Sequence, residues 1–130
     1  MMRSVAWLKG FLRYSPMLAV MGGIFFLSHQ PGGSLPLPAL AGLDKVLHAM
    51  AYAVLASTVL HAFPAPADRS AGRWHRVMVV LFCVLYGVGD EIHQSFIPAR
   101  TATGGDLLAD AAGALCRVLA VRHREAGPVA

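Results

Sequence analysis

The chain contains few charged residues and very little cysteine, and both shortages narrow its class. Only 14% of its 130 residues are charged, whereas 56% are hydrophobic. Because a soluble domain averages roughly 25% charged residues, this composition excludes an ordinary water-soluble fold and indicates a membrane protein. The two cysteines, Cys83 and Cys116, lie in apolar runs without Cys-x-x-Cys spacing, which argues against a disulfide framework or a cysteine metal site. We expect both to pack as small hydrophobic side chains.

The chain has a net charge of +4, but it lacks the other features that indicate nucleic-acid binding. No basic helix face and no sheet studded with aromatic residues accompany that charge, so we expect no nucleic-acid partner. No internal repeat or low-complexity segment is evident. The length predicts a single domain over residues 1–130.

Four apolar stretches are each long enough, or nearly so, for a helix that crosses a bilayer, which takes roughly 20 residues. Proline residues separate them, with Pro31 after the first stretch, Pro64 after the second and Pro98 after the third. The stretches run over residues 11–28, 43–63, 77–97 and 105–121, with approximate ends. The sequence therefore predicts an all-α, polytopic membrane bundle of four transmembrane helices.

The basic residues predict the orientation of this bundle, because short cytoplasmic loops collect lysine and arginine. They precede the first stretch, separate the second from the third, and lie at or beyond the end of the fourth: Arg3, Lys9, Arg13, Arg69, Arg73, Arg76, Arg117, Arg122 and Arg124. Both termini are therefore expected in the cytoplasm. The first stretch also resembles a signal peptide, but the small-residue triplet 39–41 lies far beyond its apolar core, so we expect an uncleaved helix.

Polar side chains gather at the opposite, outer end of the predicted helices. In the second stretch Asp44, His48 and Tyr52 are spaced i, i+4, i+8, which places them on one face. A charge near the bilayer centre costs roughly 2.5–3.5 kcal/mol, so such groups usually face a partner or a wet cavity. We predict that three helices share one water-reachable pocket. Its candidate residues are Asp44, Lys45, His48, Tyr52, Asp90, Glu91, His93, Gln94, Asp106 and Asp110.

Arg100 lies in the short connection 98–105, which forces the third and fourth helices into an antiparallel pair. We expect its guanidinium to hang over the pocket, where it could hold a phosphate or carboxylate with two hydrogen bonds. Backbone N–H groups at the start of the fourth helix would add to such an anion site. Thr103 could instead cap that helix, with Asp106 completing a near capping box.

Each of these residues also has a purely structural interpretation. The histidines could simply bond to neighbouring helices, and Asp90 or Asp106 could form a salt bridge with Lys45 or Arg100. Asp90 and His93 could ligate an ion together with His48 or Asp106. The spacing nevertheless lacks the i, i+4 histidine pair of helical zinc enzymes, since Glu91 and His93 point to opposite sides of a helix. We predict no bound metal and no cofactor.

Two segments, "DKVLHAMAYAVL" and "GVGDEIHQSFIPARTATGGDLLADAAG", resemble the signatures of the VanZ-like membrane proteins, and "FFLSHQP" is similar to the end of that family's first helix. The resemblance covers roughly residues 24–113. It differs from the family pattern at Ala99, where the family has glycine before the loop arginine, and at Asp110, where asparagine is common. It implies that the family's polar set is Asp44, Lys45, His48, Tyr52, Asp90, Glu91, His93, Gln94, Arg100 and Asp106.

The family takes its name from glycopeptide tolerance, specifically toward teicoplanin, so the resemblance implies a multi-pass protein of the bacterial cytoplasmic (inner) membrane that serves the cell envelope. It does not imply a molecular activity. The partner that we expect is a membrane lipid or a lipid-linked envelope precursor. The sequence predicts neither the substrate nor the oligomeric state.

Our leading hypothesis is an activity on a lipid head group at the outer leaflet, by hydrolysis or transfer at a phosphoester. His93 or His48 would act as general acid or base, and Asp90 or Glu91 would orient the imidazole. Arg100 and Lys45 would hold the phosphate. The remaining residues predicted to bind substrate are Asp44, Tyr52, Gln94, Asp106 and Asp110. The alternative is a non-catalytic protein that binds a lipid, wall precursor or lipoglycopeptide. A transporter fits less well, because no charged residue continues through the midplane.

Overall fold

The computed structural model describes residues 2–32, 34 and 40–125, and these form four α-helices without a strand. They are α1 (Met2–Ser28), α2 (Leu43–Ala62), α3 (Arg69–Gln94) and α4 (Gly104–Glu125). The prediction of an all-α fold is confirmed. Ala39, the first residue of the triplet 39–41, and the side chains of Arg3, Lys9, Arg122 and Arg124 lie outside the part that is described.

Three of these helices are long and apolar enough to cross a membrane: Gly10–Ser28 within α1, Leu43–Ala62 and Arg69–Gln94. The fourth helix differs because it carries Asp106, Asp110 and Arg117. The chain is therefore a multi-pass membrane protein, and its described residues include three helices that could span the bilayer. Many large apolar side chains point outward, such as Phe26 and Leu108, which are 65% and 73% exposed. Such surfaces suit contact with lipid.

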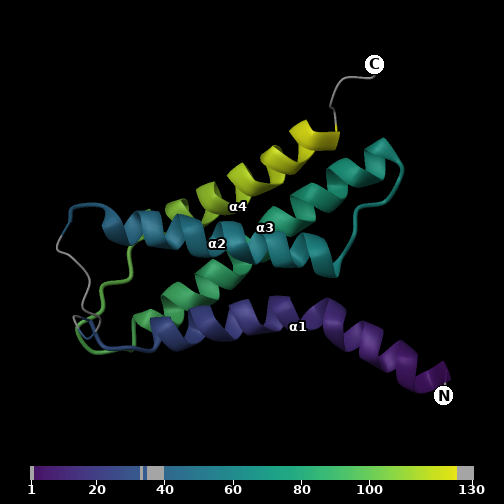
Figure 1. Cartoon of the computed structure of the whole chain (residues 1–130). Coiled ribbons are helices and arrows are strands. Elements are labelled where there is room, and N and C mark those ends of the chain that lie inside the picture. The colour runs from purple at the N-terminus through teal and green to yellow at the C-terminus, as the bar shows by residue number, and fades with distance from the viewer. Residues whose placement is uncertain (1, 33, 35–39, 126–130) are drawn as a thin grey trace.

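The helices lie together as an antiparallel bundle (Figure 1). The start of α1, the end of α4 and the α2–α3 connection lie at one end, and the α1–α2 and α3–α4 connections lie at the other. α4 packs most extensively against α2, and α1 is the more peripheral helix. Figure 1 also shows α1 bent part-way along its length; proline has no N–H for the helical ladder, and Pro16 lies inside this helix.

Several predicted helix ends were wrong, because apolarity alone does not define where a helix stops. α3 begins eight residues earlier than expected, since the Asp68 side chain caps it by accepting a hydrogen bond from the Ala71 N–H at 2.7 Å. It ends at Gln94, so Ile97 lies in the following turn rather than in the helix. α1 likewise begins before residue 11, and α4 extends beyond residue 121.

The core is small and lies mainly between α2, α3 and α4. Tyr52, Leu55 and Cys83 are fully or almost fully buried in it. Cys83 therefore packs as predicted, whereas Cys116 is exposed on α4. Small residues let α2 and α4 approach closely: a Cβ added to Gly113 would lie 2.0 Å from the backbone oxygen of Ala49. This close approach decides which side chains of the two helices can meet.

Candidate functional site

A cavity of about 170 Å³ opens between α1, α2 and α3, close to the end that carries the α1–α2 and α3–α4 connections. Six of the residues predicted from the sequence line it: Asp44, His48, Tyr52, Asp90, Gln94 and Arg100. The other lining residues are Ile24, Leu27, Ser28, Leu47 and Ala51. The prediction that three helices share a polar pocket is thus met in part, but α1 takes the place of α4 in the wall.

His48 and Asp110 form a hydrogen-bonded pair at the junction of α2 and α4. His48 Nδ1 lies 2.9 Å from Asp110 Oδ1, and the Asp110 side chain has no exposed surface, while that of His48 is 17% exposed. Gly113, one turn further along α4, permits the approach that makes this contact possible. The residue that orients the imidazole of His48 is therefore Asp110, rather than Asp90 or Glu91 as the sequence suggested.

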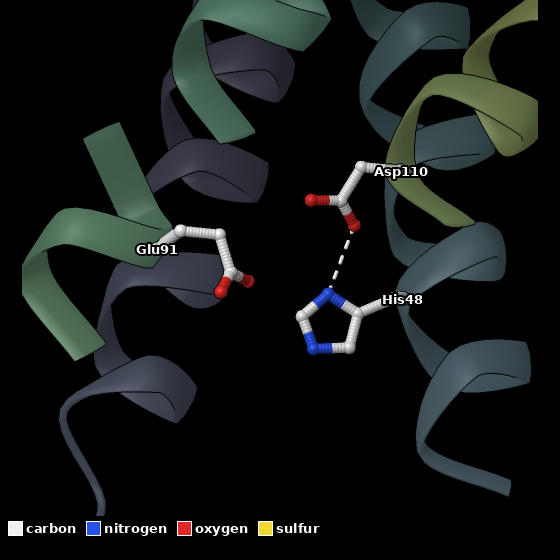
Figure 2. A group of neighbouring side chains, drawn as sticks. All are labelled: His48, Glu91 and Asp110. Carbon is white, nitrogen blue, oxygen red and sulfur yellow. Dashed lines mark hydrogen bonds and ion pairs between the residues drawn. The ribbon is translucent and has the colours of Figure 1, made fainter. Parts of the chain in front are cut away.

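Glu91 reaches toward this pair from α3 (Figure 2). One ligand-type atom from each of His48, Glu91 and Asp110 lies within 4.8 Å of the others. Both carboxylate oxygens of Glu91, and Oδ2 of Asp110, are buried without a hydrogen-bond partner. These three residues could hold a cation, and they differ from the set around Asp90 and His93 that the sequence analysis considered.

Lys45 links the beginnings of α2 and α4. Its ammonium group donates to Asp106 Oδ1 and, at 2.8 Å, to Asp44 Oδ2. The Thr103 hydroxyl accepts from the Asp106 N–H at 3.3 Å and donates to Asp106 Oδ2 at 2.7 Å. The expected salt bridge of Asp106 and the capping by Thr103 are thus both present. Lys45 is consequently engaged by two carboxylates before any ligand arrives.

Asp90 joins α1 to α3 through a buried polar cluster. Its Oδ2 accepts from the Ser28 hydroxyl at 2.7 Å and from Gln94 Nε2 at 2.9 Å. Asp90 and Gln94 are both buried, as is Ser28. Sequence reasoning did not select Ser28 as a site residue. The available signal was its position, as the polar residue that closes an apolar helix directly before His29 and Gln30.

Arg100 lines the cavity as predicted, but it also ties the α3–α4 connection to the end of α1. Its guanidinium donates to the backbone oxygens of Leu27 at 2.6 Å and Gln30 at 3.1 Å, and to Gln94 Oε1 at 3.4 Å. Carbonyl groups at a helix C-terminus carry partial negative charge, which favours a cation there. Because a guanidinium has five N–H donors, it retains capacity for an anionic ligand.

His93 lies apart from this cavity. Its Nε2 is 3.2 Å from His29 Nδ1, and its ring stacks on Phe25 with centroids 4.5 Å apart. On a helix of 3.6 residues per turn, a residue three positions after Asp90 is rotated about 60° one way, whereas Glu91 is rotated about 100° the other way. Glu91 therefore turns toward His48, and His93 turns toward α1.

Two tyrosines lie one helical turn further into the bundle, Tyr52 after His48 in α2 and Tyr86 before Asp90 in α3. Tyr52 is almost fully buried, and its hydroxyl has no hydrogen-bond partner. Tyr86 donates to the backbone oxygen of Met21 at 2.7 Å and thereby holds α1 against α3. Of these two tyrosines, Tyr52 is the one that offers an unused donor at the cavity wall.

The comparisons with known proteins agree with the signatures in the sequence. The model of the family described as VanZ/LLP1 matches residues 11–123, which is most of the chain. No curated protein and no solved structure matches the chain. The resemblance noted from the two segments is thereby confirmed, and the chain belongs to the VanZ/LLP1 family.

Proposed function

We propose that this protein acts on a phosphate-bearing lipid head group, by hydrolysis or transfer at a phosphoester, in the outer leaflet of the bacterial cytoplasmic membrane. One observation carries the proposal: His48, held by the fully buried Asp110, lies in the wall of a cavity that Arg100 also lines. A proton-transfer group and an anion-binding group thus share one small space between the helices.

The His48–Asp110 pair has the geometry of a general acid–base unit. When Nδ1 donates to a carboxylate, the other ring nitrogen is the acceptor, so the pair fixes the tautomer and the ring orientation. Nε2 of His48 would take a proton from an attacking hydroxyl group or water and return it to the leaving oxygen. Arg100 would offset the charge that develops on the phosphate oxygens. His93 remains the second candidate histidine from the sequence.

The distribution of charge supports an outward-facing cavity. Arg13 and Arg117 lie toward the opposite end of the bundle, as do Arg69, Arg73 and Arg76 in the first turns of α3. By the preference of basic residues for the cytoplasmic side, that end is cytoplasmic, and so are both termini. The cavity would then open toward the outer leaflet, where lipid-linked envelope precursors are used.

We also propose that α4 is the fourth membrane crossing. It runs beside α2 in Figure 1, and its two aspartates, Asp106 and Asp110, are both buried. Arg117 donates to the Ser57 hydroxyl of α2 at 2.6 Å. Charges that are paired within the bundle cost far less than charges that face hydrocarbon, so the composition of α4 is compatible with a buried span.

A non-catalytic binding role is the second candidate, and the apolar part of the cavity wall favours it. Ile24, Leu27, Leu47 and Ala51 would accommodate an acyl chain without any chemistry. The ligand would be a lipid, a lipid-linked wall precursor or a lipoglycopeptide, and the protein would be an accessory in teicoplanin-type tolerance. Lys45, already paired with two carboxylates, is also less available to a transferring phosphate than the sequence suggested.

The test is head-group release from vesicles of phosphatidylethanolamine and phosphatidylglycerol that contain the purified protein. We expect His48→Gln to lower turnover at least about 100-fold while bound lipid is retained. His61→Gln, a change at an exposed histidine near the other end of α2, is the matched control. A loss caused by His93→Gln but not by His48→Gln would reassign the base. Lipid binding that depends on Arg100 without any turnover would support the binding role instead.

A further inference from the structure

We propose that His48, Glu91 and Asp110 bind one divalent transition-metal ion at the side of the cavity. Three helices each supply one residue: His48 from α2, Glu91 from α3 and Asp110 from α4. Their ligand-type atoms lie within 4.8 Å of one another. Ligands at about 2.0–2.2 Å from a tetrahedral ion lie roughly 3.4 Å apart, so small side-chain rotations suffice to close the set.

Unsatisfied buried oxygens are the second, independent observation. The side chain of Asp110 is completely buried, and its Oδ2 has no hydrogen-bond partner. Both oxygens of Glu91 are likewise buried and unpartnered. Figure 2 shows the Glu91 carboxylate and the free oxygen of Asp110 directed into the space between α3 and the other two helices. A buried carboxylate without partners is costly, and a bound cation would remove that cost.

The charges around this space also favour a cation. Glu91 and Asp110 converge on a single imidazole. Two basic side chains at this end of the bundle are engaged elsewhere, Lys45 by Asp44 and Asp106, and Arg100 by backbone oxygens and Gln94. A divalent ion would balance two carboxylates, which one neutral histidine cannot do.

The donor set indicates the class of metal. One imidazole nitrogen with two carboxylates suits Zn²⁺, or Mn²⁺ and Fe²⁺, whereas Mg²⁺ and Ca²⁺ prefer oxygen ligands alone. Asp110 Oδ1 lies 2.9 Å from His48 Nδ1, so an ion held by both residues would replace this hydrogen bond. With the ion bound, His48 would act as a ligand and not as the general base of the proposed function. Three protein ligands leave a position for water or a phosphate oxygen. Only the binding of a phosphate oxygen in this open position depends on the proposed function.

The experiment measures metal content and thermal unfolding of the full chain in detergent, after removal of metal with a chelator and titration with ZnCl₂ or MgCl₂. We expect Zn²⁺ to bind in equimolar amount and to raise the unfolding midpoint, and Mg²⁺ to do neither. Glu91→Gln should weaken Zn²⁺ binding at least about 10-fold, and His48→Gln should do the same. Asp44→Asn, a change at an exposed carboxylate of the same cavity, should bind Zn²⁺ as the natural chain does.

Glu91→Gln is the decisive variant, because Glu91 is only partly buried and its replacement is isosteric, so failure to fold is not the expected outcome. Zn²⁺ binding that is unchanged in this variant, or that is lost only in His93→Gln, would overturn the proposal. If the metal-free protein binds no added Zn²⁺ but still turns over lipid, the metal site is overturned and the proposed function stays intact. Zn²⁺ bound through Glu91, in a protein without turnover, would support the site and count against the catalytic proposal.

Discussion

Gly113 of α4 packs directly on the backbone of α2 at Ala49, so closely that a Cβ on Gly113 would lie 2.0 Å from the Ala49 oxygen. The obstacle is backbone, which cannot rotate away. Gly113→Ala must therefore push α4 from α2, at a cost of about 1–3 kcal/mol or more. The same displacement should break the His48–Asp110 bond, since Asp110 lies one turn from Gly113. We expect a lower unfolding midpoint in detergent and loss of any lipid turnover.

Gly89→Ala is the matched control for this prediction. Gly89 lies in α3, and a Cβ there would meet nothing within 4 Å. Since alanine favours a helix over glycine by roughly 1 kcal/mol, this change should preserve or raise the midpoint. Equal destabilisation by the two substitutions would show that Gly113 has no special packing role.

The contrast between these glycines shows what the sequence could and could not predict. The number of helices, their approximate positions and the gathering of polar residues at one end follow from apolar runs and helical spacing. Spacing places residues on the face of one helix, but it does not give the distance or rotation between two helices. The partner of His48 was therefore assigned to Asp90 or Glu91, whereas the close packing at Gly113 brings Asp110 to it.

The position of His93 outside the cavity has the same origin. Asp90 and His93 were considered together as ligands of one ion because they are three residues apart, but residues at this spacing differ by about 60° in direction around the helix. The cavity lies on the other side of Asp90, so His93 meets His29 instead. Ser28 was overlooked for the opposite reason. Its position at the end of an apolar helix marks it only weakly, and its contact with Asp90 spans 62 residues.

Ala99 has a backbone conformation that suits glycine, with φ of 58°. An L-residue in this left-handed region is strained by roughly 1–2 kcal/mol, and the resemblance places a glycine here in related proteins. Ala99→Gly should raise the unfolding midpoint, with a gain of about 1 kcal/mol after the added freedom of the unfolded chain is subtracted. Ala102→Gly in the same connection should give no gain, because Ala102 has no positive φ. A lower unfolding midpoint for Ala99→Gly would show that the backbone of Ala99 is not strained.

Lys45 should matter to stability through Asp106 and hardly at all through Asp44. Lys45→Met leaves the carboxylate of Asp106, whose side chain is 7% exposed, without its cation. Thr103 still donates to it, so we expect a loss of about 1–3 kcal/mol. Asp44→Asn removes only an exposed partner and should leave the midpoint nearly unchanged. Similar midpoints for both variants would mean that the Lys45–Asp106 pair does not stabilise the bundle.

The His48–Asp110 contact can be measured by a double-mutant cycle of His48→Gln, Asp110→Asn and the two together. Residues that share a direct hydrogen bond typically show interaction energies of about 0.5–3 kcal/mol in such cycles. We expect a coupling in this range from thermal unfolding. The same cycle with Asp90→Asn in place of Asp110→Asn should give a smaller coupling, since Asp90 bonds Ser28 and Gln94 rather than His48. Additive effects at His48 and Asp110 would argue against the pair.

Arg100 should prove irreplaceable by lysine, because its shape is used as well as its charge. The guanidinium contacts two backbone oxygens of α1 and its C-terminal turn and one side chain of α3, a fork that a single ammonium group cannot reproduce. Arg100→Lys should therefore increase hydrogen exchange at residues 27–32 and 95–101 almost as much as Arg100→Gln does. If lysine restored protection to the level of arginine, charge alone would explain the contact, and the role of Arg100 in tying the α3–α4 connection to α1 would be wrong.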